Sequence, residues 1–141
     1  MPRFLEDFAV GQVFDSEALP LEAEQIARFD EEFHVPSDRP GSQAADGWHI
    51  AALTMRLLVL SELSPAGGMV GLGMDELAWP SPAHAGDELR ARAEVLDVRQ
   101  SDSRPEYGLV KMRVTTSTAS GEAVQIMTAN LLVPKGRPKS E

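Results

Sequence analysis

The hydrophobic positions between Asp46 and Leu63 predict a long helix at the centre of the fold. Its apolar side chains occupy nearly every side of a helical wheel, with one stripe of Ile50, Leu53, Leu57 and Leu60, and with Ala51, Met55, Leu58 and Val59 over most of the rest. A helix that is apolar nearly all round is typical of a buried helix. It is too short, and too interrupted by Arg56 and Glu62, to cross a bilayer, which needs about 20 apolar residues. We therefore expect other elements to wrap around it. We expect Arg56 to be buried and to reach a carboxylate, a carbonyl or a partner subunit, with a structural ion pair favoured.

The start of this helix carries its own signals. Asp46 is predicted as the N-cap, because its carboxylate can accept a hydrogen bond from an unpaired N–H of the first turn and its charge suits the positive end of the helix dipole. Gly47 follows and, lacking a side chain, lets another backbone or a ligand approach closely. A small-molecule site at this helix start is therefore possible.

The flanking patterns predict one further helix and several strands. A short strand is expected at about 12–18, and Ile26, Phe29 and Phe33 recur with helical spacing in the segment 20–33. Pro36 should stop that helix, since the residue before a proline avoids helical angles. Alternating or β-rich runs predict strands at 69–79, 89–98, 108–118 and 122–133, and the last three should form an antiparallel meander because their connections are short.

This order of elements predicts an α+β protein in which an antiparallel sheet wraps around one long central helix, the hot-dog architecture. A chain of 141 residues suits a single core. We expect one domain over residues 1–134 and a basic C-terminal tail over residues 135–141, where Pro, Gly, Lys and Arg are frequent.

Composition narrows the classes of function. The net charge of -9 and the pI near 4.8 argue against a nucleic-acid-binding protein, which needs a clustered basic surface. The chain has no cysteine, which excludes disulfides and thiolate ligands, and its three scattered histidines do not predict a metal site. The first residues show no apolar signal segment, so the expected location is the cytoplasm, with no membrane partner.

Several strings, in order along nearly the whole chain, carry a resemblance to a known family. They are Phe4–Phe14, Gly47–Leu53, Gly73–Pro80 followed by Pro82, Gly86–Leu89, and Ser101–Pro105. Together they resemble the MaoC-like dehydratases, which are similar to the (R)-specific enoyl-CoA hydratases. The resemblance implies a hydro-lyase of fatty acid metabolism that adds water to a 2-enoyl-CoA, and a homodimer or dimer of dimers. It implies no cofactor other than the coenzyme A of the substrate, which is an acyl-CoA or an acyl-carrier thioester.

In that family an Asp and a His activate the water, and backbone N–H groups at the start of the central helix hold the thioester oxygen. Carried onto this chain, the catalytic residues are Asp30, His34 and Gly47. The chemistry is sound, because a helix N-terminus stabilises a developing oxyanion and a carboxylate with an imidazole handles water and its proton near neutral pH. Trp48 and His49, next to Gly47, are the expected substrate-binding residues.

Two departures from the family pattern keep other interpretations open. Asp30 and His34 are four positions apart rather than five, so Glu31 is an alternative acid, and the segment between His34 and Gly47 is shorter than usual. An ordinary helix-surface pair is the simplest alternative for Asp30 and His34. The alternative functions are a hot-dog acyl-CoA thioesterase and a non-catalytic protein that binds acyl thioesters. The candidates for contacts with the phosphates of coenzyme A are Arg104, Lys111, Lys135, Arg137 and Lys139.

Overall fold

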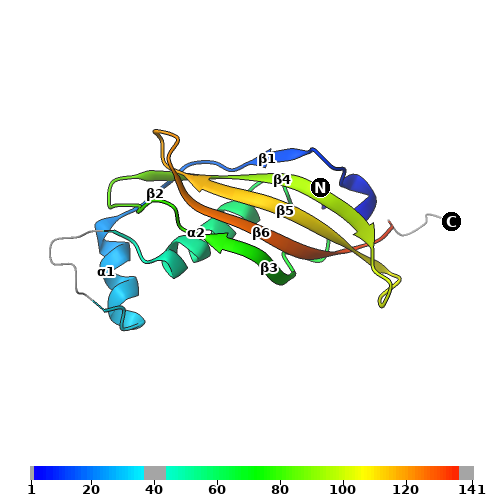
Figure 1. The fold of residues 1–141 in the computed structure, drawn as a ribbon, viewed down its shortest axis with the longest axis horizontal. Helices are drawn as coiled ribbons and strands as arrows, with labels where there is room; N and C mark the ends of the chain where they lie inside the picture. The colour runs from blue at the N-terminus through cyan, green and yellow to red at the C-terminus, as the bar shows by residue number, and fades with distance from the viewer. Residues whose placement is uncertain (1, 37–43, 137–141) are drawn as a thin grey trace.

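The structure, a computed structural model, describes residues 2–36 and 44–136. Its elements in chain order are η1 (Leu5–Asp7), β1 (Val13–Asp15), β2 (Leu19–Pro20), α1 (Ala23–Glu32), α2 (Gly47–Val59), β3 (Gly71–Ala78), β4 (Glu88–Gln100), β5 (Tyr107–Ser117) and β6 (Ala123–Pro134). Helix α2 lies against one face of a curved sheet, and α1 lies beyond the end of the sheet that is nearest to β2 (Figure 1). This arrangement confirms the predicted α+β class.

The sheet is antiparallel throughout its named strands, in the order β1-β4-β5-β6-β3, with β2 pairing separately with β4. The predicted meander of β4, β5 and β6 is confirmed. Strand β3 does not extend the meander in sequence order but pairs with β6 at the far edge of the sheet. The single strand expected at 12–18 is instead two short pieces, because β1 and β2 each pair with only part of the long strand β4.

One face of the sheet forms the core with α2. Along β4, the alternate residues Leu89, Ala91, Ala93 and Val95 are buried, as expected for a strand with one face against the core. From α2, Ile50, Leu53, Leu57 and Leu58 join the same core cluster. At this contact, the buried residues of the helix, three or four positions apart, lie in the same apolar layer as the alternate residues of the strand.

The prediction that α2 is surrounded on all sides is wrong for the single chain. Trp48, Met55 and Val59 are more than half exposed, and Arg56 is exposed rather than buried in an ion pair. The helix also ends at Val59, four residues before the predicted Leu63. The sheet covers only the side of α2 that faces it, and a second apolar side remains open. Among the described residues, no helix has the length and apolar character required to span a membrane.

Candidate active site

A cleft of about 600 Å³ opens between the C-terminal end of α1, the start of α2 and the segment that follows β3. The described residues that line it are Asp30, Val35, Pro36, Ala44, Ala45, Asp46, Gly47, Ile50, Trp79, Pro80, Ser81, Pro82, Ala83 and Val124. Two of the predicted catalytic residues, Asp30 and Gly47, therefore lie in one cleft although they come from different helices. No group of three His, Asp or Glu side chains within residues 2–36 and 44–136 is arranged to hold a metal ion.

The start of α2 leaves one backbone donor available to this cleft. The Asp46 carboxylate accepts the Trp48 N–H at 2.9 Å, which confirms Asp46 as the N-cap. The Gly47 N–H has no hydrogen-bond acceptor in the part of the chain that the structure describes. Unpaired N–H groups at a helix N-terminus attract negative charge. The Gly47 amide is thus the group at this position that suits a carbonyl oxygen acquiring negative charge.

Gly47 is required here because the Trp79 indole packs directly on its Cα. A Cβ at position 47 would lie 2.5 Å from two carbon atoms of that ring. The indole Nε1–H donates to Gln125 at 2.8 Å, and the buried Gln125 side chain in turn donates to Thr54 at 3.2 Å. This network connects the wall of the cleft to the core between α2 and β6, so the indole is held in place on both sides.

Asp30 lies in the last turn of α1 and is half-buried. Its Oδ1 atom is fully buried and has no hydrogen-bond partner within the described residues. The preceding residue, Phe29, stacks flat on the His49 ring, with 4.6 Å between the ring centres and 5° between the planes. That stack brings the third residue of α2 against the end of α1.

His49 is only 7% exposed, and its Nδ1 atom is also buried without a partner in the described chain. Burial lowers the pKa of His49 from its ordinary value, and the carboxylates of Asp30 and Asp46 act in the opposite direction. Because a buried site disfavours the charged imidazolium, the ring is neutral near pH 7. His49 is not among the described residues that line the cleft, and its ring packs on Phe29, so a direct contact with substrate stays a prediction.

His34 occupies a different environment from the one predicted. Helix α1 ends at Glu32, and His34 adopts a left-handed backbone conformation with φ of 53° just beyond the cap. Its side chain is exposed and does not line the cleft, and the same exposure applies to Glu31. A left-handed residue after a helix end redirects the chain. The structure does not bring His34 and Asp30 together in the cleft, and a catalytic role for His34 stays a prediction.

Trp48 belongs to a second, apolar groove of about 450 Å³ rather than to the cleft. This groove runs between the open side of α2 and the sheet, and its lining includes Met55, Met74, Met127 and Leu131. Trp48 contacts Trp79 edge to face, with 5.3 Å between ring centres, so the two tryptophans separate the groove from the cleft.

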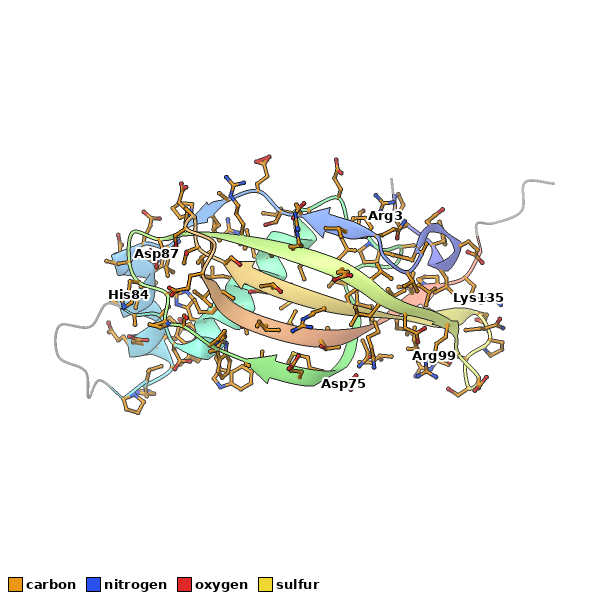
Figure 2. The ribbon with its side chains drawn as sticks, turned by 45° about the horizontal axis from the view of Figure 1, so that its top comes forward. Arg3, Asp75, His84, Asp87, Arg99 and Lys135 are labelled. Atoms are coloured by element: carbon orange, nitrogen blue, oxygen red, sulfur yellow. The ribbon has the colours of Figure 1, made fainter. Side chains whose placement is uncertain are left out.

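The described basic residues that were considered for coenzyme A do not line the cleft. None of the described residues that line it is Lys or Arg. His84 and Asp87 follow the cleft segment at one end of the sheet, whereas Lys135 lies at the opposite end, near Arg99 (Figure 2). Arg104 follows Arg99 in the turn between β4 and β5, and Lys111 pairs with Asp75 of β3 at 3.0 Å. Arg137 and Lys139 lie outside the described residues.

Comparison with known proteins finds a family model and curated relatives that match this chain. A model of the mesaconyl-CoA hydratase family matches residues 45–140. The mesaconyl-CoA hydratase of Haloarcula hispanica is 32% identical over 82 residues, which are 57% of this chain and 23% of that protein. The chain therefore spans about a quarter of the length of this curated relative.

Two solved structures extend the comparison to almost the entire chain. The crystal structure of a MaoC-like dehydratase from Rhodospirillum rubrum is 43% identical and has a TM-score of 0.87, over 97% of this chain and 99% of that one. A Mycobacterium tuberculosis protein with a double hot-dog fold matches 99% of this chain with 46% of its own, at 20% identity and a TM-score of 0.75.

Proposed function

The chain belongs to the mesaconyl-CoA hydratase family, and from that membership we propose that it is a hydro-lyase that reversibly adds water to the double bond of a 2-enoyl thioester. Its predicted relation to the MaoC-like dehydratases is confirmed by the similarity to the Rhodospirillum rubrum protein, and the hot-dog fold is confirmed by the double hot-dog structure. The proposal for this chain starts from the hydratase chemistry of the family.

One observation carries the proposal: the Asp30 carboxylate and the Gly47 amide line the same cleft. In the proposed reaction, Asp30 takes a proton from a water molecule whose oxygen bonds to the β-carbon of the enoyl thioester. The electrons of the double bond move to the thioester oxygen, which the Gly47 N–H stabilises. The carboxylic acid then returns the proton to the α-carbon, so that H and OH have been added and the thioester is restored.

The acyl carrier is proposed to be coenzyme A or protein-bound pantetheine. The cleft itself carries the acidic residues Asp30 and Asp46, which repel the negative charge of phosphate groups. The phosphates of either carrier would therefore lie outside the cleft, and the acyl and pantetheine parts inside it.

We also propose that the protein acts as a homodimer. The apolar groove beside α2 is lined by the exposed side chains of Trp48, Met55 and Met74. Val59 at the end of α2, and Val70 and Leu72 around the start of β3, are exposed as well. Strand β3 is exposed along nearly its whole length and pairs only with β6 among the described strands. An apolar patch next to an unpaired strand edge is what a second copy covers most readily.

The test is incubation of the pure protein with crotonyl-CoA and with mesaconyl-CoA, followed by the loss of the enoyl absorbance. Asp30→Asn should lower kcat by about 10²–10⁴-fold, the range that general acid–base groups contribute. The matched control is Glu31→Gln, since Glu31 is the neighbouring exposed acid on the same helix.

Release of free thiol without loss of the double bond would instead identify a thioesterase. Binding of the thioester without either reaction would identify a non-catalytic protein, the interpretation that the exposed position of His34 favours. Full hydratase activity in Asp30→Asn would exclude the proposed role of Asp30.

A further inference from the structure

Three buried side-chain polar atoms have no hydrogen-bond partner among the described residues. One is Gln25 Oε1, earlier on α1, and the other two, Asp30 Oδ1 and His49 Nδ1, lie at the junction of α1 and α2. Buried polar side-chain atoms are almost always hydrogen-bonded in folded proteins, so each exception needs an explanation. The latter two exceptions come from neighbouring positions: Phe29, which directly precedes Asp30, stacks on the His49 ring. Asp30 Oδ1 of an ionised carboxylate can only accept a hydrogen bond, and His49 Nδ1 can donate one.

The surroundings of His49 show which partner it suits. The charged groups that act on its ring are Asp30 of α1 and Asp46 at the start of α2. Asp46 already accepts the Trp48 N–H, whereas Asp30 Oδ1 is unsatisfied. The parallel stack on Phe29 fixes the plane of the imidazole, so its Nδ1 edge has a set direction relative to the end of α1.

We propose that the His49 imidazole is the positioning partner of the Asp30 carboxylate, donating its Nδ1–H to Oδ1, directly after a small rotation of the Asp30 side chain or through one water molecule. A single water commonly bridges two polar groups that are near each other but not bonded. The other carboxylate oxygen of Asp30 is then held toward the cleft, ionised and able to accept a proton. This inference rests on the proposed function, and it gives Asp30 a different imidazole partner from His34, the histidine that the family resemblance implied.

The proposal also determines which nitrogen of the His49 ring carries the proton. A neutral imidazole carries one N–H, and a hydrogen bond from Nδ1–H to a carboxylate selects that tautomer. With the proton on the other nitrogen, Nδ1 and Oδ1 would both be buried acceptors without a donor. That arrangement would disfavour the folded state.

Two substitutions at position 49 separate positioning from simple packing. His49→Phe keeps an aromatic ring to stack on Phe29 but removes the donor. His49→Asn removes the ring but places an N–H donor near the position of Nδ1. A hydrogen-bonding role predicts that His49→Phe loses about 10-fold or more in kcat with little change in KM, and that His49→Asn retains more activity than His49→Phe. It also predicts that the acidic limb of the pH–rate profile moves to higher pH in His49→Phe, because a donor to the ionised carboxylate is gone.

His84→Phe is the matched control, since His84 is exposed in a turn at the same end of the molecule. Its kcat and pH profile should equal those of the wild type. The inference is overturned if His49→Phe has the wild-type pH profile and kcat, or if His49→Asn is the poorer enzyme of the two while both remain folded by circular dichroism.

A spectroscopic measurement makes the test independent of activity. With three histidines in the chain, the ¹⁵N signals of His49 can be assigned by substitution. The expected result is an Nδ1–H tautomer at pH 7.5 and a lower pKa of His49 in Asp30→Asn, because the carboxylate that raises it is removed. An Nε2–H tautomer that Asp30→Asn leaves unchanged would refute the pair. If the Nδ1–H tautomer is found in a protein that hydrates no enoyl thioester, the His49–Asp30 pair is supported and the proposed function is refuted.

Discussion

Gly47→Ala is the substitution for which the structure makes the sharpest prediction. The new Cβ would lie 2.5 Å from the Cδ2 and Cε2 atoms of Trp79 and 2.8 Å from Cζ2. Carbon atoms pack at about 3.5–4.0 Å, so the indole must move by roughly 1 Å. That movement strains its 2.8 Å hydrogen bond to Gln125, whose side chain is fully buried.

The magnitude follows from three contributions. Overpacking a fitted site costs about 1–3 kcal/mol, and weakening the bond to a buried acceptor adds about 1 kcal/mol. Against these, replacing Gly by Ala in a helix ordinarily stabilises by up to about 1 kcal/mol. The expected net loss is about 1–3 kcal/mol, or about 3–9 °C in Tm for a domain of this size. A loss of stability in Gly47→Ala would therefore indicate the clash with Trp79, because helix propensity alone predicts a gain.

The assay is thermal and urea unfolding of Gly47→Ala beside the control Gly71→Ala, where an added Cβ would meet no atom within 4 Å. A double-mutant cycle with Trp79→Ala isolates the clash, because Gly47→Ala should cost little once the indole is absent. A Gly47→Ala protein as stable as the Gly71→Ala control would refute the packing argument. So would a loss that persists undiminished in the Trp79→Ala background.

Three further predictions concern the core, the open face and the acid response. Thr54→Val should destabilise the fold by about 1–3 kcal/mol in urea unfolding, because two buried side chains lose their hydrogen-bond partner. These are Thr116 and Gln125, which are bonded to Thr54 at 2.6 Å and 3.2 Å. Unchanged stability would contradict a stabilising role of this network. Met74→Glu should convert the proposed dimer to a monomer in light scattering, since it puts a charge into the apolar groove. A wild-type protein that is already a monomer would contradict the proposed dimer. Because the pKa of His49 is lower in the folded protein, the unfolded chain binds more protons as the pH drops below the ordinary pKa of 6.5. The stability of the fold should therefore decrease in that range, and the decrease should be smaller in His49→Phe. An equal fall in both proteins would contradict the burial of a neutral ring.

The sequence by itself determined the features that depend on near neighbours along the chain. The Asp46 cap, the helix that follows it and the strands 88–100, 107–117 and 123–134 were predictable, because capping and hydrophobic periodicity act over a few residues. The family resemblance also pointed to Asp30 and Gly47, and the fold brings both to one cleft.

Only the tertiary structure decided which side of α2 is covered and which histidine packs against the end of α1. Periodicity reports that a surface is apolar but not what covers it, so the exposed Met55 and Arg56 could not be foreseen. The family resemblance suggested His34, yet α1 ends at Glu32 and the side chain of His34 is exposed. Packing between the two helices instead stacks His49 on Phe29. Such contacts join residues about 20 positions apart, and their geometry depends on how whole elements pack rather than on local pattern.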